Sequence, residues 1–189
     1  MSLTFFKETL EKSLITKRDD YIYFINPITD GIPEIEPNLL EEVVSEMHKS
    51  IVKCGKIDKI VTLEAMGIPL AAGLSLKMKI PFVVIRKKHY GLPGELCVDQ
   101  ITGYSESKFY INGINKEDNV IVVDDVLSTG GSLRAVLNVF KKNSVNVKGV
   151  FVAVDRGNAA ERIRDEFKIN VNVLVKVNIV NGKVFVKNL

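Results

Sequence analysis

Short apolar runs rich in β-branched residues alternate along the chain with segments whose apolar residues recur at helical spacing. Runs of this length and composition are typical of strands that are buried on both faces of a sheet. Five such runs are present, at Ile60–Leu63, Phe82–Ile85, Val120–Val123, Val150–Val154 and Val171–Val177. The pattern therefore predicts a sheet built around these five strands.

Helical spacing is clearest after Pro37, where apolar residues recur every three or four positions as far as Ile51, and Gly55 follows the last turn. Segments Ile68–Met78 and Leu133–Phe140 repeat the pattern between successive strands. Strands joined through helices pair in parallel with right-handed crossovers. We therefore expect an α/β fold, an open, mostly parallel, twisted sheet flanked by helices, with ligands at the carboxyl ends of its strands.

Two regions depart from this alternation. Residues 21–37, here called the hood, are rich in Pro and Gly, and we expect an extended loop laid over another part of the molecule. In residues 91–113, here called the flap, polar residues alternate with apolar ones after two glycines. This pattern predicts a β-hairpin that stands away from the sheet and is flexible. No linker composition interrupts the chain, so residues 1–189 are expected to form one domain.

Composition narrows the class of protein. Of the 189 residues, 46% are hydrophobic and 26% charged, and no stretch approaches the ~20 apolar residues of a membrane span. A net charge of +3 is too small for a dedicated nucleic-acid binder, so we expect small, locally bound anions. The cysteines (Cys54, Cys97) and histidines (His48, His89) show no metal-ligand spacing. Charged residues interrupt the short apolar run at the amino terminus, so we expect a cytoplasmic protein without a signal peptide.

The most informative segment follows the strand Val120–Val123. The strand ends in two carboxylates, Asp124 and Asp125, and a loop of small residues then enters a helix near Leu133. Glycines, hydroxyl groups and the free N–H groups of a first helical turn form a phosphate cradle. Carboxylates repel a phosphate but accept hydrogen bonds from sugar hydroxyls. The loop comprises Ser128, Thr129, Gly130, Gly131 and Ser132, here called the phosphate loop.

The order of these residues predicts a site for a ribose 5-phosphate. In the alternative interpretation Ser128 and Thr129 only cap the helix and the aspartates are solvated. The segment lacks the Lys and the glycine spacing of a Walker loop, and no G-x-G-x-x-G fingerprint occurs elsewhere.

Two further segments follow strands in the same manner. Glu64, Ala65, Met66 and Gly67, here called the Glu64 loop, lead into a helix whose N–H groups would face a second anion. Arg86, Lys87, Lys88 and His89, here called the basic segment, suit a diphosphate leaving group that carries Mg²⁺. The alternatives are an ordinary helix start and a solvated basic edge.

Together these residues closely resemble the type I phosphoribosyltransferases, whose motif is an apolar strand, two acidic residues and a T-G-G loop. The resemblance implies that the phosphate loop holds the 5′-phosphate of 5-phosphoribosyl-1-pyrophosphate (PRPP) and that Asp124 and Asp125 hold its ribose hydroxyls. It implies that the Glu64 loop, Arg86 and Lys87 bind pyrophosphate, with Mg²⁺ carried on PRPP rather than by a protein metal site. A homodimer is also implied, since the basic segment often reaches a neighbour's site.

The resemblance extends to the base-binding region. The run Phe24–Pro33 resembles the hood of adenine and xanthine enzymes, and Gly149–Arg156 resembles the strand that faces the base. In the alternative interpretation, Asp155 and Arg156 form a surface ion pair. The base-binding candidates are Ile28, Leu127, Val154, Asp155 and Arg156.

The choice of base rests on departures from the family patterns. Met66 stands where adenine enzymes have Arg, and Gly103-Tyr104 stands where their flap has Glu, with Glu106 nearby. Ser128 stands where bacterial and animal hypoxanthine-guanine enzymes have Asp, so no general acid or base is assigned. The chain most resembles the archaeal hypoxanthine/guanine branch, which implies purine salvage to IMP or GMP. The alternatives are an adenine or xanthine enzyme and a non-catalytic regulator, which would carry a helix-turn-helix domain ahead of the fold.

Overall fold

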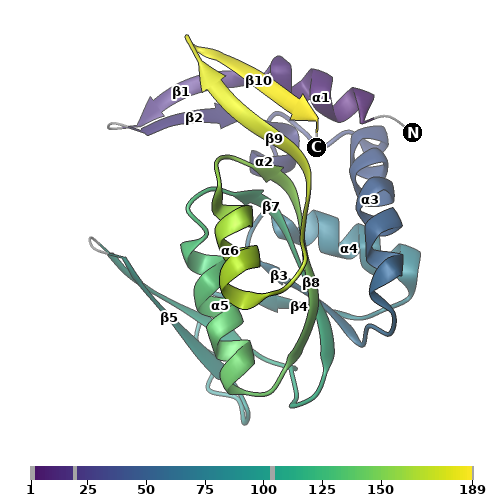
Figure 1. The fold of residues 1–189 in the computed structure, drawn as a ribbon, viewed down its shortest axis with the longest axis vertical. Coiled ribbons are helices and arrows are strands. Elements are labelled where there is room, and N and C mark those ends of the chain that lie inside the picture. The colour runs from purple at the N-terminus through teal and green to yellow at the C-terminus, as the bar shows by residue number, and fades with distance from the viewer. Residues whose placement is uncertain (1–2, 19–20, 103–104, 189) are drawn as a thin grey trace.

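A six-stranded sheet forms the centre of the protein in a computed structural model, which describes residues 3–18, 21–102 and 105–188 (Figure 1). The strand order is β10-β9-β8-β7-β3-β4, and only β10 runs antiparallel to its neighbour. The strands are β3 (Lys59–Leu63), β4 (Phe82–Ile85), β7 (Asn119–Leu127), β8 (Asn146–Asp155), β9 (Val171–Val180) and β10 (Lys183–Asn188). All five predicted strands are confirmed, Phe82–Ile85 with the same bounds and the other four within longer elements, and so is the expected fold class.

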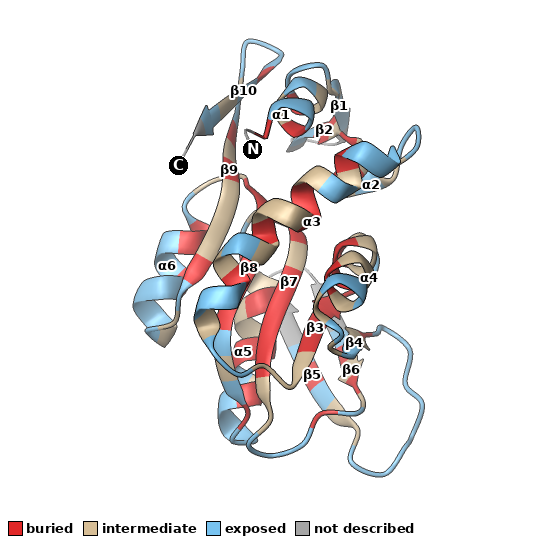
Figure 2. Cartoon of the chain, turned by 90° about the vertical axis from the view of Figure 1, so that its right-hand side faces the viewer, coloured by how far each residue is buried: buried red, intermediate tan, exposed pale blue. Residues whose placement is uncertain are grey.

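Helices cover both faces of this sheet. One face packs against α1 (Thr4–Glu11), α3 (Pro37–Ile51), which continues into η1 (Val52–Cys54), and α4 (Gly67–Met78), whereas the other packs against α5 (Gly131–Lys142) and α6 (Ala159–Phe167). Neighbouring residues of β7 belong to different clusters: Ile121 and Val123 to the first, Val120 and Val122 to the second. This alternation explains why the strand reads as one continuous apolar run, and Figure 2 shows β7 and β8 buried along much of their length.

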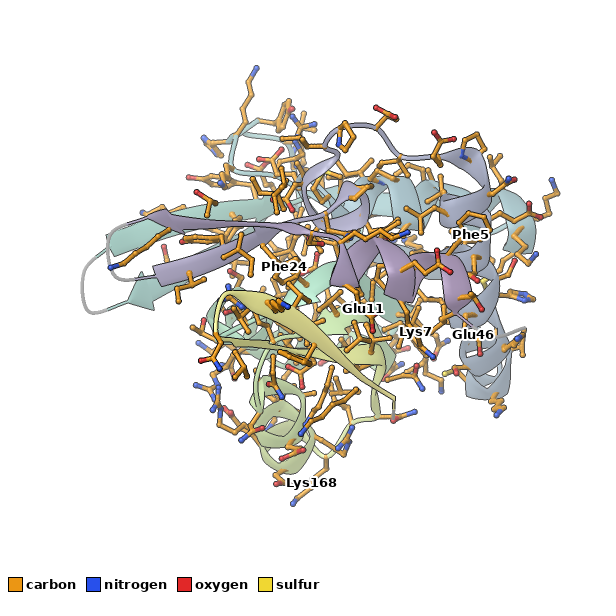
Figure 3. All side chains as sticks on the ribbon, turned by 90° about the horizontal axis from the view of Figure 1, so that it is seen from above. Phe5, Lys7, Glu11, Phe24, Glu46 and Lys168 are labelled. Atoms are coloured by element: carbon orange, nitrogen blue, oxygen red, sulfur yellow. The ribbon has the colours of Figure 1, made fainter. Side chains whose placement is uncertain are left out.

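The hood is more ordered than the sequence suggested. Tyr21–Ile25 forms strand β2, paired antiparallel with β1 (Leu14–Arg18), and Pro27–Asp30 forms the short helix α2. The expectation of an extended loop over residues 21–37 is therefore wrong for its first half. In Figure 3, seen from above, Phe24 lies where the β1–β2 hairpin meets the β9–β10 hairpin, and it shares a buried cluster with Val177 and Val184. Long-range packing of this kind stabilises a strand that has no clear period of its own.

The predicted flap hairpin is confirmed as β5 (Leu96–Thr102) and β6 (Ser105–Ile111). It does not stand entirely away from the core, because Val98, Phe109 and Ile111 are buried in the cluster that contains α5. Tyr110 also exchanges two backbone hydrogen bonds with Arg86 at the end of β4. The outer ends of β5 and β6 project from the molecule (Figure 1). Gly103-Tyr104 lies outside the described residues, and the side chain of Glu106 is likewise undescribed.

Within the described residues, no helix combines the length and the apolar character that crossing a membrane requires.

Candidate active site

Two hollows lie side by side at the carboxyl ends of the central strands, where β3 and β7 are neighbours although β4 follows β3 in the chain. The first, about 300 Å³ and here called the loop hollow, is lined by Leu63, Glu64, Lys87, Phe109 and residues 124–133. The second, about 440 Å³ and here called the hood hollow, is lined by Tyr23, Phe24, Thr29, Asp30, Val126, Ser128, Thr129 and Arg156. Val126, Ser128 and Thr129 line both, so the two hollows adjoin along these residues.

The phosphate loop lines the loop hollow with all five of its residues. Gly130 adopts φ +80°, and a Cβ there would lie 3.0 Å from Ile163 Cδ1 and 3.3 Å from Ala159 Cβ of α6. Glycine therefore lets the loop turn tightly against α6 before α5 begins at Gly131. The first turn of this 12-residue helix lines the hollow through Gly131, Ser132 and Leu133, and the N-terminus of a helix favours a bound phosphate.

Asp124 and Asp125 both line the loop hollow, and the N–H of Asp125 donates a hydrogen bond to Asp124 Oδ1 at 3.1 Å. Burial, followed by the negative charge of Asp125, raises the pKa of Asp124 well above its ordinary value. Burial chiefly raises the pKa of Asp125 to about 6, and the negative charge of Asp30 adds to the rise. The two side chains are adjacent hydrogen-bond acceptors. Ionising both of them in this buried place costs free energy unless hydroxyl donors or a cation bind them.

Glu64 directs its carboxylate toward the basic segment. Its Oε1 accepts the N–H of Lys87 at 2.6 Å, and its Oε2 lies 2.5 Å from Arg86 Nε. The Lys87 hydrogen bond is the main reason that the pKa of Glu64 is lowered, and Arg86 contributes less. Glu64 thus lines the hollow as an anchor for two cations, a role that sequence reasoning did not give it.

The remainder of the Glu64 loop packs tightly. Gly67 is the first residue of α4, and a Cβ there would lie 2.1 Å from Thr62 Oγ1 and 3.0 Å from Asp124 Oδ1. Only glycine fits in this place. Met66 contacts the hood, since a Cβ on Gly31 would lie 3.3 Å from its Cε. Ala65 is exposed, and the Glu64–Ala65 peptide bond is cis.

Glu95 organises the loop that follows the basic segment, a role that no sequence motif indicated. Its carboxylate, whose side chain is 5% exposed, lies 3.0 Å from His89 Nε2 and accepts hydrogen bonds from Asn112 Nδ2 at 2.6 Å and the N–H groups of Tyr90 and Gly91. Burial opposes its ionisation, but these hydrogen bonds outweigh burial and lower its pKa. Lys87 is the one residue of the basic segment that lines the loop hollow, because Arg86 pairs with Glu64 and Lys88 lies over the Tyr90 ring.

Arg156 is the one base-binding candidate that lines the hood hollow. Its guanidinium donates a hydrogen bond to the Ile22 carbonyl and lies 5.9 Å from the centroids of both the Tyr23 and Phe24 rings. The hood residues Tyr23, Phe24, Thr29 and Asp30 were not singled out from the sequence, because residues so far from β8 show no local sign of meeting it.

The other four candidates lie elsewhere. Ile28 and Val154 are buried in the core, and Leu127 lines the loop hollow. Asp155 is fully buried and faces Lys176 Nζ at 3.9 Å, with no hydrogen bond to either oxygen from the described residues. The structure therefore does not bring Ile28, Leu127, Val154 or Asp155 to the hood hollow, and the surface ion pair considered for Asp155 and Arg156 is not formed.

Comparison with known proteins decides the family. The model of the phosphoribosyl transferase domain matches residues 34–184. The chain belongs to the phosphoribosyltransferase family. A relative named hypoxanthine/guanine phosphoribosyltransferase, from Methanothermus fervidus, is 51% identical over 182 residues that cover 96% of each chain. The protein of that name from Methanocaldococcus infernus is 47% identical over 181 residues, covering 96% of this chain and 98% of its own.

Solved phosphoribosyltransferase structures share the fold at low sequence identity. The adenine phosphoribosyltransferase of Leishmania donovani superposes with a TM-score of 0.74 at 19% identity, covering 92% of this chain and 79% of that one. The enzyme from Thermoanaerobacter pseudethanolicus gives a TM-score of 0.73 at 18% identity, covering 93% and 99%. At these identities the likeness establishes the phosphoribosyltransferase architecture alone.

Proposed function

We propose that this phosphoribosyltransferase transfers the 5-phosphoribosyl group of PRPP to hypoxanthine or guanine, forming IMP or GMP and pyrophosphate. The observation that carries the proposal is that the phosphate-loop hollow adjoins a second hollow, in which Arg156 lies 5.9 Å from the centroids of the Tyr23 and Phe24 rings. An anion site joined to a flat, donor-bearing aromatic site suits a phosphorylated sugar and a 6-oxopurine. The archaeal relatives named above carry the same activity in their names.

In this proposal PRPP occupies the loop hollow. The phosphate loop holds the 5′-phosphate through N–H and hydroxyl groups, and Asp124 and Asp125 accept hydrogen bonds from the ribose hydroxyls. Lys87, with Arg86 held beside it by Glu64, binds the pyrophosphate that leaves. The protein thus places the reacting carbon of ribose at the junction of the two hollows.

The base occupies the hood hollow. A guanidinium only donates hydrogen bonds, so Arg156 favours the 6-oxo group of hypoxanthine or guanine. The 6-amino group of adenine would place donor against donor and leave a buried polar group unsatisfied. Tyr23 and Phe24 offer ring faces against which a purine can stack.

Mg²⁺ fits this donor set as a partner of the substrate. No group of three or more His, Cys, Asp or Glu side chains in the described part of the chain could hold a metal by itself. Hard oxygen ligands suit Mg²⁺, and the Asp124–Asp125 pair presents carboxylate oxygens in the loop hollow. We assign the ion to the oxygens of PRPP beside this pair, where it supplies charge neutralisation for the leaving pyrophosphate.

The reaction itself needs positioning and exclusion of water more than covalent help. Transfer of a glycosyl group passes through an oxocarbenium-like ribose, which water would capture. The hood closes one side of the site through β2 and α2, and the base of the flap closes another through Phe109. These elements shield the reacting carbon while the two anions of PRPP are held apart.

A panel of four bases tests the proposal. The purified protein is incubated with PRPP, MgCl₂ and hypoxanthine, guanine, xanthine or adenine, and nucleotides are measured by chromatography. We expect IMP and GMP to form, with kcat/KM at least about tenfold above that for adenine. Faster use of adenine, or use of xanthine alone, would assign the chain to one of those enzymes instead. Binding of PRPP without any nucleotide would indicate a regulator.

We also propose a cytoplasmic homodimer. Cys54 and Cys97 are both free thiols, which suits a reducing compartment. The basic segment is exposed at Lys88 and His89, so its side chains are accessible to a second copy. Light scattering at several concentrations tests the dimer, for which we expect twice the mass of one chain.

A further inference from the structure

Transfer of ribose to a purine releases a proton that the site must accept. The bond between C1′ and the pyrophosphate oxygen breaks, a bond between C1′ and a ring nitrogen forms, and the imidazole-ring N–H of the base is lost. A carboxylate within reach of that nitrogen accelerates such a transfer by about 10²–10⁴-fold. The hood hollow holds one carboxylate among the described residues that line it, Asp30.

We propose that Asp30 accepts this proton from the incoming purine, an inference that rests on the function proposed above. Asp30 lines the hood hollow together with Ser128 and Thr129, which also line the loop hollow where ribose would lie. It therefore stands at the junction where the reacting nitrogen meets C1′. Neither carboxylate of the Asp124–Asp125 pair lines the hood hollow, and that pair is engaged with ribose hydroxyls in our proposal.

The carboxylate of Asp30 is oriented through one oxygen only. Oδ2 accepts the N–H of Asn26 at 2.9 Å and the Thr29 hydroxyl at 2.6 Å. Oδ1 accepts no hydrogen bond from the described residues, so it is available to a ligand. A base held by donors on one oxygen with the other directed to substrate is the arrangement that proton transfer requires.

Helix α2, which carries Asp30, is held firmly for so short an element. The Asn26 side chain is buried and caps α2 by accepting the N–H of Ile28 at 3.0 Å. Its amide nitrogen lies 3.2 Å from Thr9 Oγ1, which ties α2 to α1. At the other end Gly31 adopts φ +69° and packs against Met66 of the Glu64 loop. The position of Asp30 is therefore set by both the hood and the pyrophosphate side of the site.

Three ionisable groups surround this position: Asp125 from β7, Arg156 from β8 and Tyr23 from β2. The charge of Asp30 is felt at Asp125, which places the two carboxylates close together. After transfer, the proton passes from Oδ1 to solvent or to the departing pyrophosphate, and the carboxylate is restored.

The test compares Asp30→Asn with Glu34→Gln in steady-state and single-turnover assays with PRPP and hypoxanthine. Asparagine keeps an oxygen that can accept from Asn26 and Thr29, so α2 retains its cap, but the amide cannot accept the proton. Glu34 is an exposed hood carboxylate that lines neither hollow, and its neutral variant controls for the loss of charge. We expect kcat to fall at least about a hundredfold in Asp30→Asn and to stay within about twofold of wild type in Glu34→Gln.

Two further measurements separate proton transfer from a structural role. Thr29→Val removes a donor to Oδ2, so the acid limb of the kcat profile should move to higher pH. An 8-aza analogue of hypoxanthine, whose triazole-ring N–H is more acidic than the imidazole-ring N–H of hypoxanthine, should lose much less rate than hypoxanthine in Asp30→Asn. An equal loss for both bases, or an unmoved pH profile in Thr29→Val, would overturn the proposal.

The two proposals fail in different ways. If wild type makes no nucleotide from hypoxanthine or guanine, the proposed function is wrong. If wild type is active and Asp30→Asn keeps its kcat and pH profile, the function stands and Asp30 is not the proton acceptor. Unchanged stabilisation of Asp30→Asn by PRPP in thermal melts shows that the loop hollow is intact in the variant.

Discussion

Glu64 at the end of β3 holds Arg86 at the end of β4, with 2.5 Å between Oε2 and Nε, while its other oxygen accepts the Lys87 N–H at 2.6 Å. A carboxylate beside a pyrophosphate site would repel the ligand if it were free. Because both oxygens are engaged, the carboxylate instead holds the Arg86 guanidinium and the backbone of Lys87, whose residue lines the loop hollow. A residue that the motif suggests as a ligand is thus better explained as a positioning residue.

We predict that Glu64→Ala raises the KM for PRPP about 5- to 50-fold with a smaller effect on kcat, because Arg86 and Lys87 lose their anchor. Glu64→Gln should cost less, since its amide oxygen still accepts the Lys87 N–H. Initial-rate measurements at varied PRPP test this order. A KM for PRPP that is unchanged in Glu64→Ala would show that the basic segment is ordered without Glu64.

The Asp124–Asp125 pair should lower the stability of the unliganded protein above pH 6. The pKa of Asp125 is about 6 in the fold and near the ordinary 3.8 in the unfolded chain, so the folded state binds more protons between these values. Stability therefore falls as pH rises through this range, by up to roughly 3 kcal/mol.

Accordingly, Asp125→Asn should raise Tm at pH 8 by roughly 3–10 °C and abolish most activity. The gain in Tm should disappear near pH 4, where Asp125 is protonated in both states. Calorimetry at pH 8 and near pH 4 measures the gain in Tm, and PRPP turnover measures the loss of activity. A variant that is both active and no more stable would contradict the diol role of Asp125.

Gly67→Ala should be severely destabilising, because its Cβ would lie 2.1 Å from the buried Thr62 Oγ1. We expect a loss of at least about 3 kcal/mol in unfolding free energy or failure to fold. Thr62→Ala removes the clashing oxygen, so the double variant should recover part of the loss, with Thr62→Ala alone as the reference. Denaturant unfolding of the three variants measures the coupling, and strict additivity would exclude the predicted contact.

Arg156→Gln should raise the KM for hypoxanthine and guanine by about 10- to 100-fold and leave PRPP binding nearly unchanged. In the proposed function the guanidinium supplies donors to the 6-oxo group, and in the structure it holds the Ile22 carbonyl of the hood. Arg156→Lys keeps the charge but loses the planar donor set, so its effect should be intermediate. Relative rates with adenine and hypoxanthine distinguish base recognition from loosening of the hood, since loosening would slow both bases alike.

Much of the fold followed from the sequence because its signals are local. Each central strand is a continuous apolar run because helices cover both faces of the sheet, and the run from Val120 to Ser132 contains strand, carboxylates, loop and helix start within one stretch. Where a strand, a loop of small residues and a helix start follow one another directly, the local sequence is enough to set the geometry of the loop. The fold class, the placement of the Asp124–Asp125 pair and the loop hollow were therefore predictable.

The hood and its contacts were decided by tertiary structure. Strand β2 is stabilised by pairing with β1 and by packing against β9 and β10. Neither contact produces a regular alternation of hydrophobic and polar residues in residues 21–25. The same holds for Asp30 and Arg156, which line one hollow although they are far apart in the chain. Sequence alone determined which segments end the strands at this site, the Asp124–Asp125 pair and the phosphate loop among them. Only the fold decided which hood residues line the hood hollow, because that choice depends on long-range packing.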